Sequence, residues 1–107
     1  MAVKNRKYTR PVYLVDGSRT PFLKARGKPG PFKHADLGIY ASRPLLQRMP
    51  FSPEDFDEVI MGSTMPGPDE ANIARIVALR LGCGDKVPAY TVHRNCASGM
   101  QALDSAA

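Results

Sequence analysis

Long hydrophobic runs are absent from this 107-residue sequence, and their absence excludes several classes of protein. No apolar stretch approaches the roughly 20 residues that a membrane-spanning helix needs, so we expect no membrane span. The first seven residues include three basic ones, but no apolar segment follows them as it would in a secretory signal peptide.

Cysteine is also scarce, with only Cys83 and Cys96 in the sequence. Two cysteines are too few for the disulfide framework of a small secreted domain, which favours a reducing compartment. Neither they nor the two histidines show a CxxC or HxxxH spacing, so no metal site is expected. We therefore predict a cytoplasmic protein, with a mitochondrial location left open for a eukaryotic source.

Positive charge is concentrated at the start of the chain. Residues 1–33 hold nine Lys or Arg and one acid, Asp16, whereas residues 34–107 hold six Lys or Arg and nine acids. The basic segment at residues 1–33 could bind a phosphate-bearing ligand or a nucleic acid, or it could be a solvated tail. No aromatic residues alternate with the basic ones, so we assign residues 1–11 to a basic tail and expect no nucleic-acid partner.

Three short apolar runs predict β-strands, at residues 12–15, 59–61 and 89–92. The first run is β-branched at both ends and precedes the turn residues Asp16 and Gly17. We expect both of its faces to be buried, as in a sheet covered by helices.

Three further segments predict helices. Residues 36–49 have an apolar side, with Asp36 able to cap the helix and Pro44 expected to kink or split it. Residues 73–81 have apolar residues at helical spacing, and Gly82 follows as a natural stop. Small residues from Cys96 onward predict a buried helix.

The alternation of strands and helices predicts an α/β fold with a largely parallel sheet. The last helical pattern reaches Ala107 without a capping residue or a terminating glycine. We therefore expect the chain to be a piece of a longer protein.

Cys96 lies where a predicted strand turns into a predicted helix. The first N–H groups of a helix lack intrahelical partners and the helix dipole is positive there, which favours a thiolate. A thiolate attacks thioesters, and free N–H groups can hold the oxyanion of acyl transfer. Small residues at Ala97, Ser98 and Gly99 allow a substrate close to the backbone. The alternative is an inert core cysteine.

Cys83 has the opposite setting, because it follows a predicted helix end between two glycines. The helix dipole there opposes a thiolate, so we expect a structural cysteine.

Four segments together resemble the thiolase family, the acetyl-CoA acetyltransferases and 3-ketoacyl-CoA thiolases. They are VDGSRTPF at residues 15–22, SPEDFDEVIMG at residues 52–62, NIAR at residues 72–75 and CASGM at residues 96–100. The resemblance covers residues 12–107 and implies an incomplete N-terminal domain that ends within the helix after the nucleophile. The implied fold is thiolase-like, a layered, mixed but mostly parallel sheet covered by helices.

The resemblance implies a cysteine-dependent acyl-CoA C-acyltransferase. Cys96 would take an acyl group from an acyl-CoA, helped by its own N–H in an oxyanion hole, and CoA or a second acyl-CoA would accept it. The pathway would be fatty-acid oxidation or acetoacetyl-CoA formation, with CoA thioesters as substrates and no cofactor. His93 stands where many thiolases have asparagine, while Asn95 directly precedes the cysteine, as in the fatty-acid-oxidation branch.

The resemblance also implies supporting residues and partners. Arg19, Asn72 and Arg75 would brace the catalytic loop, partly across a dimer interface, unless they are ordinary surface arginines and a helix cap. Asn95, Ser98 and Gly99 would support the nucleophile. The implied assembly is a homodimer or homotetramer, and a complex with a fatty-acid-oxidation subunit stays open.

Two catalytic groups of the family, a histidine in a Gly-His-Pro context and a second cysteine, have no counterpart in these 107 residues. We therefore expect no thiolase turnover from this chain alone. Two alternatives stay open: another condensing enzyme of the same fold, such as a ketoacyl synthase or a hydroxymethylglutaryl-CoA synthase, and an inactive truncated module that only associates.

Overall fold

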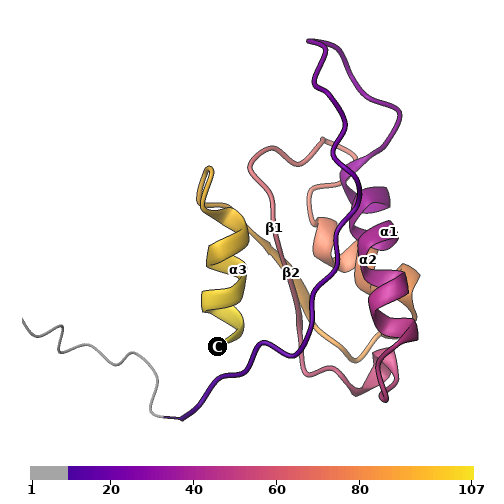
Figure 1. The fold of residues 1–107 in the computed structure, drawn as a ribbon, viewed down its shortest axis with the longest axis vertical. Helices are drawn as coiled ribbons and strands as arrows, with labels where there is room; N and C mark the ends of the chain where they lie inside the picture. The colour runs from indigo at the N-terminus through magenta and orange to yellow at the C-terminus, as the bar shows by residue number, and fades with distance from the viewer. Residues whose placement is uncertain (1–9) are drawn as a thin grey trace, which may run out of the picture.

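A computed structural model describes residues 10–107 (Figure 1). In chain order the elements are α1 (His34–Gln47), a short 3₁₀ helix (Pro53–Asp55), β1 (Val59–Gly62), α2 (Ile73–Leu81), β2 (Ala89–Val92) and α3 (Ser98–Ala106). The two strands pair in parallel, with Val59 beside Ala89 and Gly62 beside Val92. The fold is therefore α/β with a parallel sheet, as the sequence predicts.

The sheet lies between α3 on one side and α2 on the other, and α1 packs against α2 (Figure 1). The buried apolar side chains are concentrated on the α2 side. One cluster joins α1 to α2 through Ala35, Ile39, Ile73 and Val77. A second cluster beneath the end of α2 consists of Ala78, Cys83 and Val87. The core of the molecule thus lies between the sheet and the α1–α2 pair.

Both predicted ends of α2 are confirmed. The side-chain oxygen of Asn72 accepts a hydrogen bond from the backbone N–H of Arg75 at 3.2 Å, which caps the first turn. Gly82 ends the helix with a φ of 88°, a left-handed conformation that glycine adopts without a Cβ clash.

The first helix differs from its prediction at the start and at Pro44. It begins at His34, and Asp36 lies in its first turn, where its carboxylate accepts the backbone N–H of Lys33 at 3.2 Å. The helix continues through Pro44 and is not split. Proline removes the hydrogen bond to the carbonyl of Tyr40, but Tyr40 is exposed, so water can take that place.

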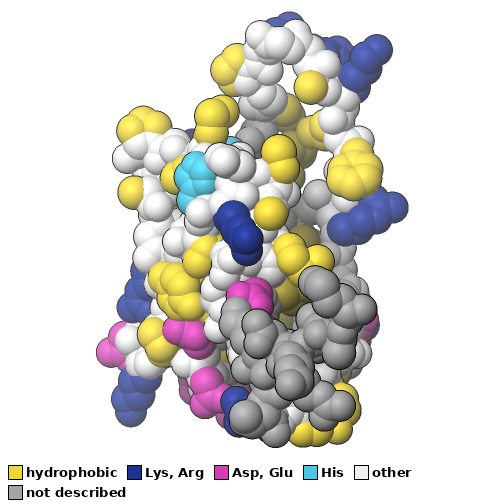
Figure 2. Space-filling model, turned by 90° about the vertical axis from the view of Figure 1, so that its left-hand side faces the viewer, with side chains coloured by type: hydrophobic (Ala, Val, Ile, Leu, Met, Phe, Trp, Pro, Cys, Tyr) yellow, Lys and Arg dark blue, Asp and Glu magenta, His cyan; other side chains and the backbone are white. Residues whose placement is uncertain are grey.

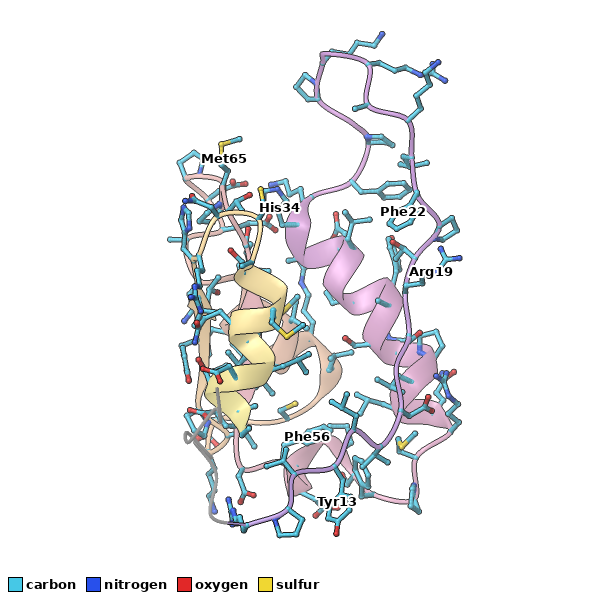
Figure 3. All side chains as sticks on the ribbon, turned by 60° about the vertical axis from the view of Figure 1, so that its left-hand side comes forward. Tyr13, Arg19, Phe22, His34, Phe56 and Met65 are labelled. Carbon is cyan, nitrogen blue, oxygen red and sulfur yellow. The ribbon has the colours of Figure 1, made fainter. Side chains whose placement is uncertain are left out.

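Residues 12–15 form no strand, which corrects the prediction made for them. Their side chains are between 49% and 80% exposed, so the expected burial on both faces is also wrong. Tyr13 projects away from the body of the molecule (Figure 3). The reason is physical: a strand depends on hydrogen bonds from a neighbour, and no part of residues 10–107 pairs with this one.

The last helix is more exposed than the sequence predicts. Ser98 is its buried residue, while Met100 is 69% exposed. Helix α3 packs against the two strands, while Met100 and Leu103 on it stay exposed. Figure 2 looks onto this side of the molecule, where hydrophobic side chains lie open to solvent.

Two predictions concern the chain as a whole. The basic tail assigned to residues 1–11 lies almost entirely outside the described residues. Within residues 10–107, no helix is both long enough and apolar enough to cross a membrane.

Candidate active site

Cys96 lies in the tight turn that joins β2 to α3, and it is exposed. Asn95, directly before it, has a φ of 46°, in the left-handed region that asparagine tolerates better than most residues. The turn is closed by hydrogen bonds from the N–H of Ala97 to the carbonyl of Arg94 at 3.0 Å and from the N–H of Ser98 to the carbonyl of Asn95 at 3.2 Å. The thiol therefore stands in the open, two residues before a helix begins, rather than in an apolar core.

The backbone N–H groups around the thiol differ in whether they are hydrogen-bonded. Those of Ala97 and Ser98 donate to carbonyl oxygens of the turn itself. Within residues 10–107 the N–H of Cys96 donates no backbone hydrogen bond. A free N–H on the nucleophile's own residue is a donor that an acyl-transfer oxyanion can use.

His93 has a structural contact in this turn. Its Nδ1 accepts the backbone N–H of Asn95 at 3.1 Å, so the imidazole holds the chain just before the cysteine. This contact gives His93 a structural role in the turn. The guanidinium of Arg94 donates to Oε1 of Gln101 on α3 at 2.9 Å, which ties the turn to that helix.

Asn72 and Arg75 tie α2 to the strand that leads into the cysteine turn. The amide nitrogen of Asn72 donates to the carbonyl of Ala89 at 3.1 Å, and the hydroxyl of Thr91 donates to the Asn72 side-chain oxygen at 3.0 Å. The guanidinium of Arg75 donates to the carbonyl of Val87 at 3.1 Å. Asn72 is thus a helix cap and a brace for β2 at once, and neither residue contacts the thiol.

Arg19 is not brought to this site. It lies on the extended segment before α1 and projects outward (Figure 3). Its guanidinium lies 5.3 Å from the ring centroid of Phe22 and donates to the carbonyl of Thr20 at 3.2 Å. Its contacts in residues 10–107 therefore stay within its own segment. Of the predicted supporting residues, Asn95, Ser98 and Gly99 are the ones that the fold places beside Cys96.

Cys83 has the structural setting that the sequence predicts. It is 2% exposed and packs with Ala78 and Val87 beneath the end of α2. Burial raises the pKa of the Cys83 thiol, because a charged sulfur would lose its water. The two cysteines of the chain are therefore separated by environment as well as by position.

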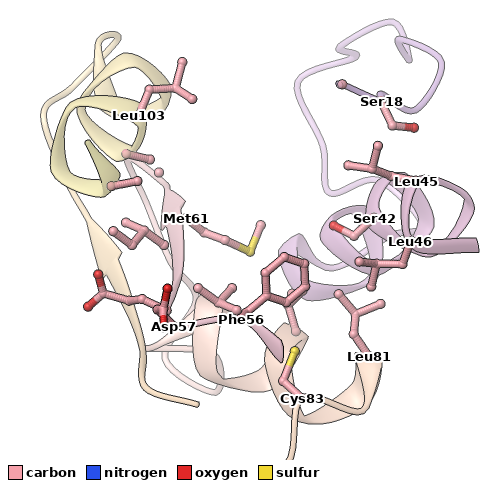
Figure 4. Close-up of a pocket in the computed structure, with 18 of the residues that line it drawn as sticks. Ser18, Ser42, Leu45, Leu46, Phe56, Asp57, Met61, Leu81, Cys83 and Leu103 are labelled. Atoms are coloured by element: carbon pink, nitrogen blue, oxygen red, sulfur yellow. The ribbon is translucent and has the colours of Figure 1, made fainter. Parts of the chain in front are cut away.

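A cleft of about 910 Å³ opens between α1 and α3 along β1 (Figure 4). Leu45 and Leu46 line it from α1, Met61 from β1 and Leu103 from α3. Cys96 does not line this cleft, although Gly99 of the following helix does. The cysteine site is therefore an exposed turn beside the cleft rather than a pocket.

Two features of the site escape sequence analysis. The hydroxyl of Ser98, which the sequence predicts as a small supporting residue without indicating any contact, is buried within the turn. Gly62, predicted only as the end of a strand, lies against the start of α3, where an added Cβ would come within 2.3 Å of the Ser98 carbonyl oxygen. Within residues 10–107, no three His, Cys, Asp or Glu side chains gather as metal ligands would.

These elements define an α/β domain in which a parallel strand leads through a left-handed turn to an exposed cysteine and then a helix. Residues 12–107 match the N-terminal domain of thiolase, and the chain belongs to the thiolase family.

Similar proteins agree with this assignment. The chain is 39% identical over 98 residues to an acetyl-CoA acetyltransferase of Candida albicans. The matched stretch covers 87% of this chain and 23% of that protein. It is 38% identical over 95 residues to the human mitochondrial 3-ketoacyl-CoA thiolase, covering 88% of this chain and 24% of that protein. The chain thus spans about a quarter of the length of these relatives.

Solved structures show the same likeness. The crystal structure of the Bacillus anthracis acetyl-CoA acetyltransferase superposes with a TM-score of 0.62 at 42% identity, over 67% of this chain and 18% of that one. The human mitochondrial 3-ketoacyl-CoA thiolase superposes with a TM-score of 0.66 at 36% identity, over 71% and 20% of the two chains. The thiolase-like fold class is confirmed by both.

Proposed function

We propose that Cys96 is the acyl-accepting nucleophile of an acyl-CoA C-acyltransferase. The observation that carries the proposal is the exposed thiol in the turn before α3, in a chain that belongs to the thiolase family. The similar proteins are named as acetyl-CoA acetyltransferases and as 3-ketoacyl-CoA thiolases, so the proposal stops at acyl-CoA as the substrate class.

The proposed step is a thioester exchange. The Cys96 sulfur attacks the thioester carbonyl of acyl-CoA, a new carbon–sulfur bond forms to Cys96, and the bond to the CoA sulfur breaks. CoA leaves as a thiol after taking up the proton that Cys96 gives up. The unused N–H of Cys96 supplies one donor to the negative oxygen of the tetrahedral intermediate.

Acylation can be tested on the 107-residue chain itself. After incubation with acetyl-CoA, intact-mass measurement and peptide mapping are expected to show one acetyl group on Cys96 and none on Cys83. Hydroxylamine cleaves thioesters, so it is expected to remove the acetyl group from the wild-type chain. The matched control is Cys96→Ser, which is expected to form no such thioester. Acetyl groups shared equally between the two cysteines, or retained in Cys96→Ser, would refute the nucleophile assignment.

A complete catalytic cycle is not expected from these residues alone. The family's later histidine and second cysteine have no counterpart here, so a proton-transfer partner for Cys96 is missing. We expect no steady-state thiolysis of acetoacetyl-CoA by CoA. Turnover that disappears in Cys96→Ser would show that this expectation is wrong, while leaving the nucleophile assignment in place.

The proposal extends to partners and location. CoA and its acyl thioesters are the proposed ligands, with no further cofactor, and the cytoplasm, or the mitochondrion in a eukaryote, is the proposed location. A homodimer or homotetramer is proposed because α3 leaves Met100 and Leu103 in solvent. Sedimentation velocity would test this, since a single folded monomer at all concentrations would exclude it.

A further inference from the structure

The hydroxyl of Ser98 bridges the two arms of the cysteine turn. Ser98 is 4% exposed, and its Oγ donates to the carbonyl oxygen of Asn95 at 2.7 Å. The same oxygen accepts the backbone N–H of Arg94 at 2.8 Å. Its two partners precede Cys96 in the chain, whereas Ser98 follows it. One hydroxyl therefore closes a loop around the nucleophile.

The turn needs such a closure because of the backbone conformation at Asn95. A left-handed residue other than glycine is disfavoured by about 1 kcal/mol or more, and it persists when its surroundings hold it. The Asn95 peptide is held from both sides. Its carbonyl accepts the N–H and the hydroxyl of Ser98, and its N–H donates to His93.

The backbone of Ser98 is fixed by a second, independent contact. Gly62, at the end of β1, approaches it so closely that a Cβ would lie 2.3 Å from the Ser98 carbonyl oxygen and 2.7 Å from the Gly99 nitrogen. The start of α3 is thus seated directly on the end of the strand. A change in the turn cannot be absorbed by moving α3 closer to the sheet, since no space is left there.

We propose that Ser98 is a positioning residue that holds the turn in which Cys96 presents its thiol and its free N–H side by side. The inference rests on the proposed function for its catalytic consequence, and on the hydrogen bonds for its structural part. Removing the hydroxyl takes away the acceptor of the Arg94 N–H and one of the two hydrogen bonds from Ser98 to the Asn95 carbonyl, so the left-handed turn is held less firmly. The thiol then stays exposed, but the turn no longer fixes the direction of the Cys96 N–H that would receive the oxyanion.

Three forms of the 107-residue chain test this: wild type, Ser98→Ala and Ser98→Thr, which keeps a hydroxyl at the same carbon. The first measurement is amide hydrogen exchange at Arg94. Loss of one hydrogen bond corresponds to an increase of about tenfold, which we expect in Ser98→Ala and not in Ser98→Thr. Ser42→Ala, on α1 and outside the hydrogen bonds of the turn, is the matched control and is expected to leave Arg94 unchanged.

The second measurement separates positioning from folding. The rate of acyl transfer from acetyl-CoA to Cys96 is expected to fall about tenfold in Ser98→Ala and to recover in Ser98→Thr. Alkylation of Cys96 by iodoacetamide needs no oxyanion donor, so its rate is expected to change by no more than about twofold.

Each outcome decides a separate point. Unchanged exchange at Arg94 in Ser98→Ala would overturn the proposal, as would an equal fall in acyl transfer and alkylation. If Ser98→Ala does not fold, Ser98→Thr still decides, because loss of Arg94 protection there would contradict the role of the hydroxyl. A wild-type chain that accepts no acetyl group refutes the proposed function, while the exchange at Arg94 still decides whether Ser98 holds the turn.

Discussion

The two sides of the sheet differ in how they are packed, and each side has one of the two cysteines. On the α2 side, apolar side chains of α1 and α2 pack in one cluster, and Ala78 of α2 and Val87 of the following loop pack against Cys83 in a second. On the α3 side, one polar residue, Ser98, is buried, and Cys96 stands in solvent. The same residue type is thus an inert core element on one side and an accessible thiol on the other.

This difference shows that the residues that stabilise the domain and the residues that present the proposed nucleophile lie on opposite sides of the sheet. Residues that stabilise the domain lie between the sheet and the α1–α2 pair, where burial raises the pKa of the Cys83 thiol. Residues that present the nucleophile lie in a turn held by hydrogen bonds rather than by apolar contacts. The comparison predicts that mutations on the two sides affect different measurements.

The largest expected effect is on the packed side. Ile73 is 1% exposed in the cluster that joins α1 to α2, so Ile73→Ala is expected to reduce the free energy of unfolding by about 2–5 kcal/mol. Met100→Ala on α3 is the matched control, with an expected change within about 0.5 kcal/mol. Urea denaturation followed by circular dichroism measures both. Equal losses would mean that the α3 side is packed as firmly as the α2 side.

The next effect concerns the contact between β1 and the start of α3. Gly62→Ala places a Cβ against the Ser98 backbone and is expected to destabilise the domain by about 1–3 kcal/mol. Gly99→Ala, one residue beyond Ser98, meets nothing within 4 Å and lies in the helix, so it is expected to be neutral or slightly stabilising. The urea midpoint measures both changes. An unchanged urea midpoint in Gly62→Ala would contradict the close contact between the end of β1 and the start of α3.

A third, more modest contrast compares the cysteines directly. Under native conditions iodoacetamide is expected to modify Cys96 at least about tenfold faster than Cys83, because only Cys96 is accessible and burial disfavours the Cys83 thiolate. Peptide mapping after timed quenching gives the two rates. In concentrated guanidinium chloride the two rates are expected to converge, which is the control. Equal rates in the native protein would remove the distinction between the two sides.

The sequence predicts the packed side better than the open side. The helix at residues 73–81, its stop at Gly82 and the two paired strands follow from local patterns that the core reinforces. Residues 12–15 have the composition of a strand, but composition cannot supply the neighbouring strand on which pairing depends. Helix α3 has the small residues of a buried helix, yet Ser98 is its one buried residue and Met100 and Leu103 are exposed.

The candidate site shows the same limit. Cys96 is predictable because its setting, a strand followed by small residues and a helix, is local in the sequence. The roles of Gly62 and of the Ser98 hydroxyl depend on a contact between segments more than thirty residues apart in the chain and on the conformation of a turn. Arg19 belongs to a family motif, but its structural contacts are with Thr20 and Phe22 rather than with the turn.

The smallest expected effect lies at the end of α1, where Arg48 binds Asp16 of the extended segment. The hydrogen bond from Arg48 to the Asp16 carboxylate, 2.8 Å long, and then that from the Gly17 N–H lower the pKa of Asp16 below its usual 3.8. The folded state therefore favours the charged carboxylate. Its contribution to stability is fully present above about pH 4 and is lost as the pH falls through the lowered folded-state value.

Asp16→Asn removes this contribution. The variant is expected to have a slightly lower urea midpoint than wild type at about pH 6, and the difference is expected to shrink towards zero as the pH falls through the lowered folded-state pKa of Asp16. Added salt should reduce it as well, because both partners are exposed. Asp57→Asn, an exposed carboxylate without an ion pair in residues 10–107, is the control and should show no such pH dependence. A difference that grows at low pH would contradict the sign of the Asp16 shift and would show that the extended segment is held to α1 by something other than this ion pair.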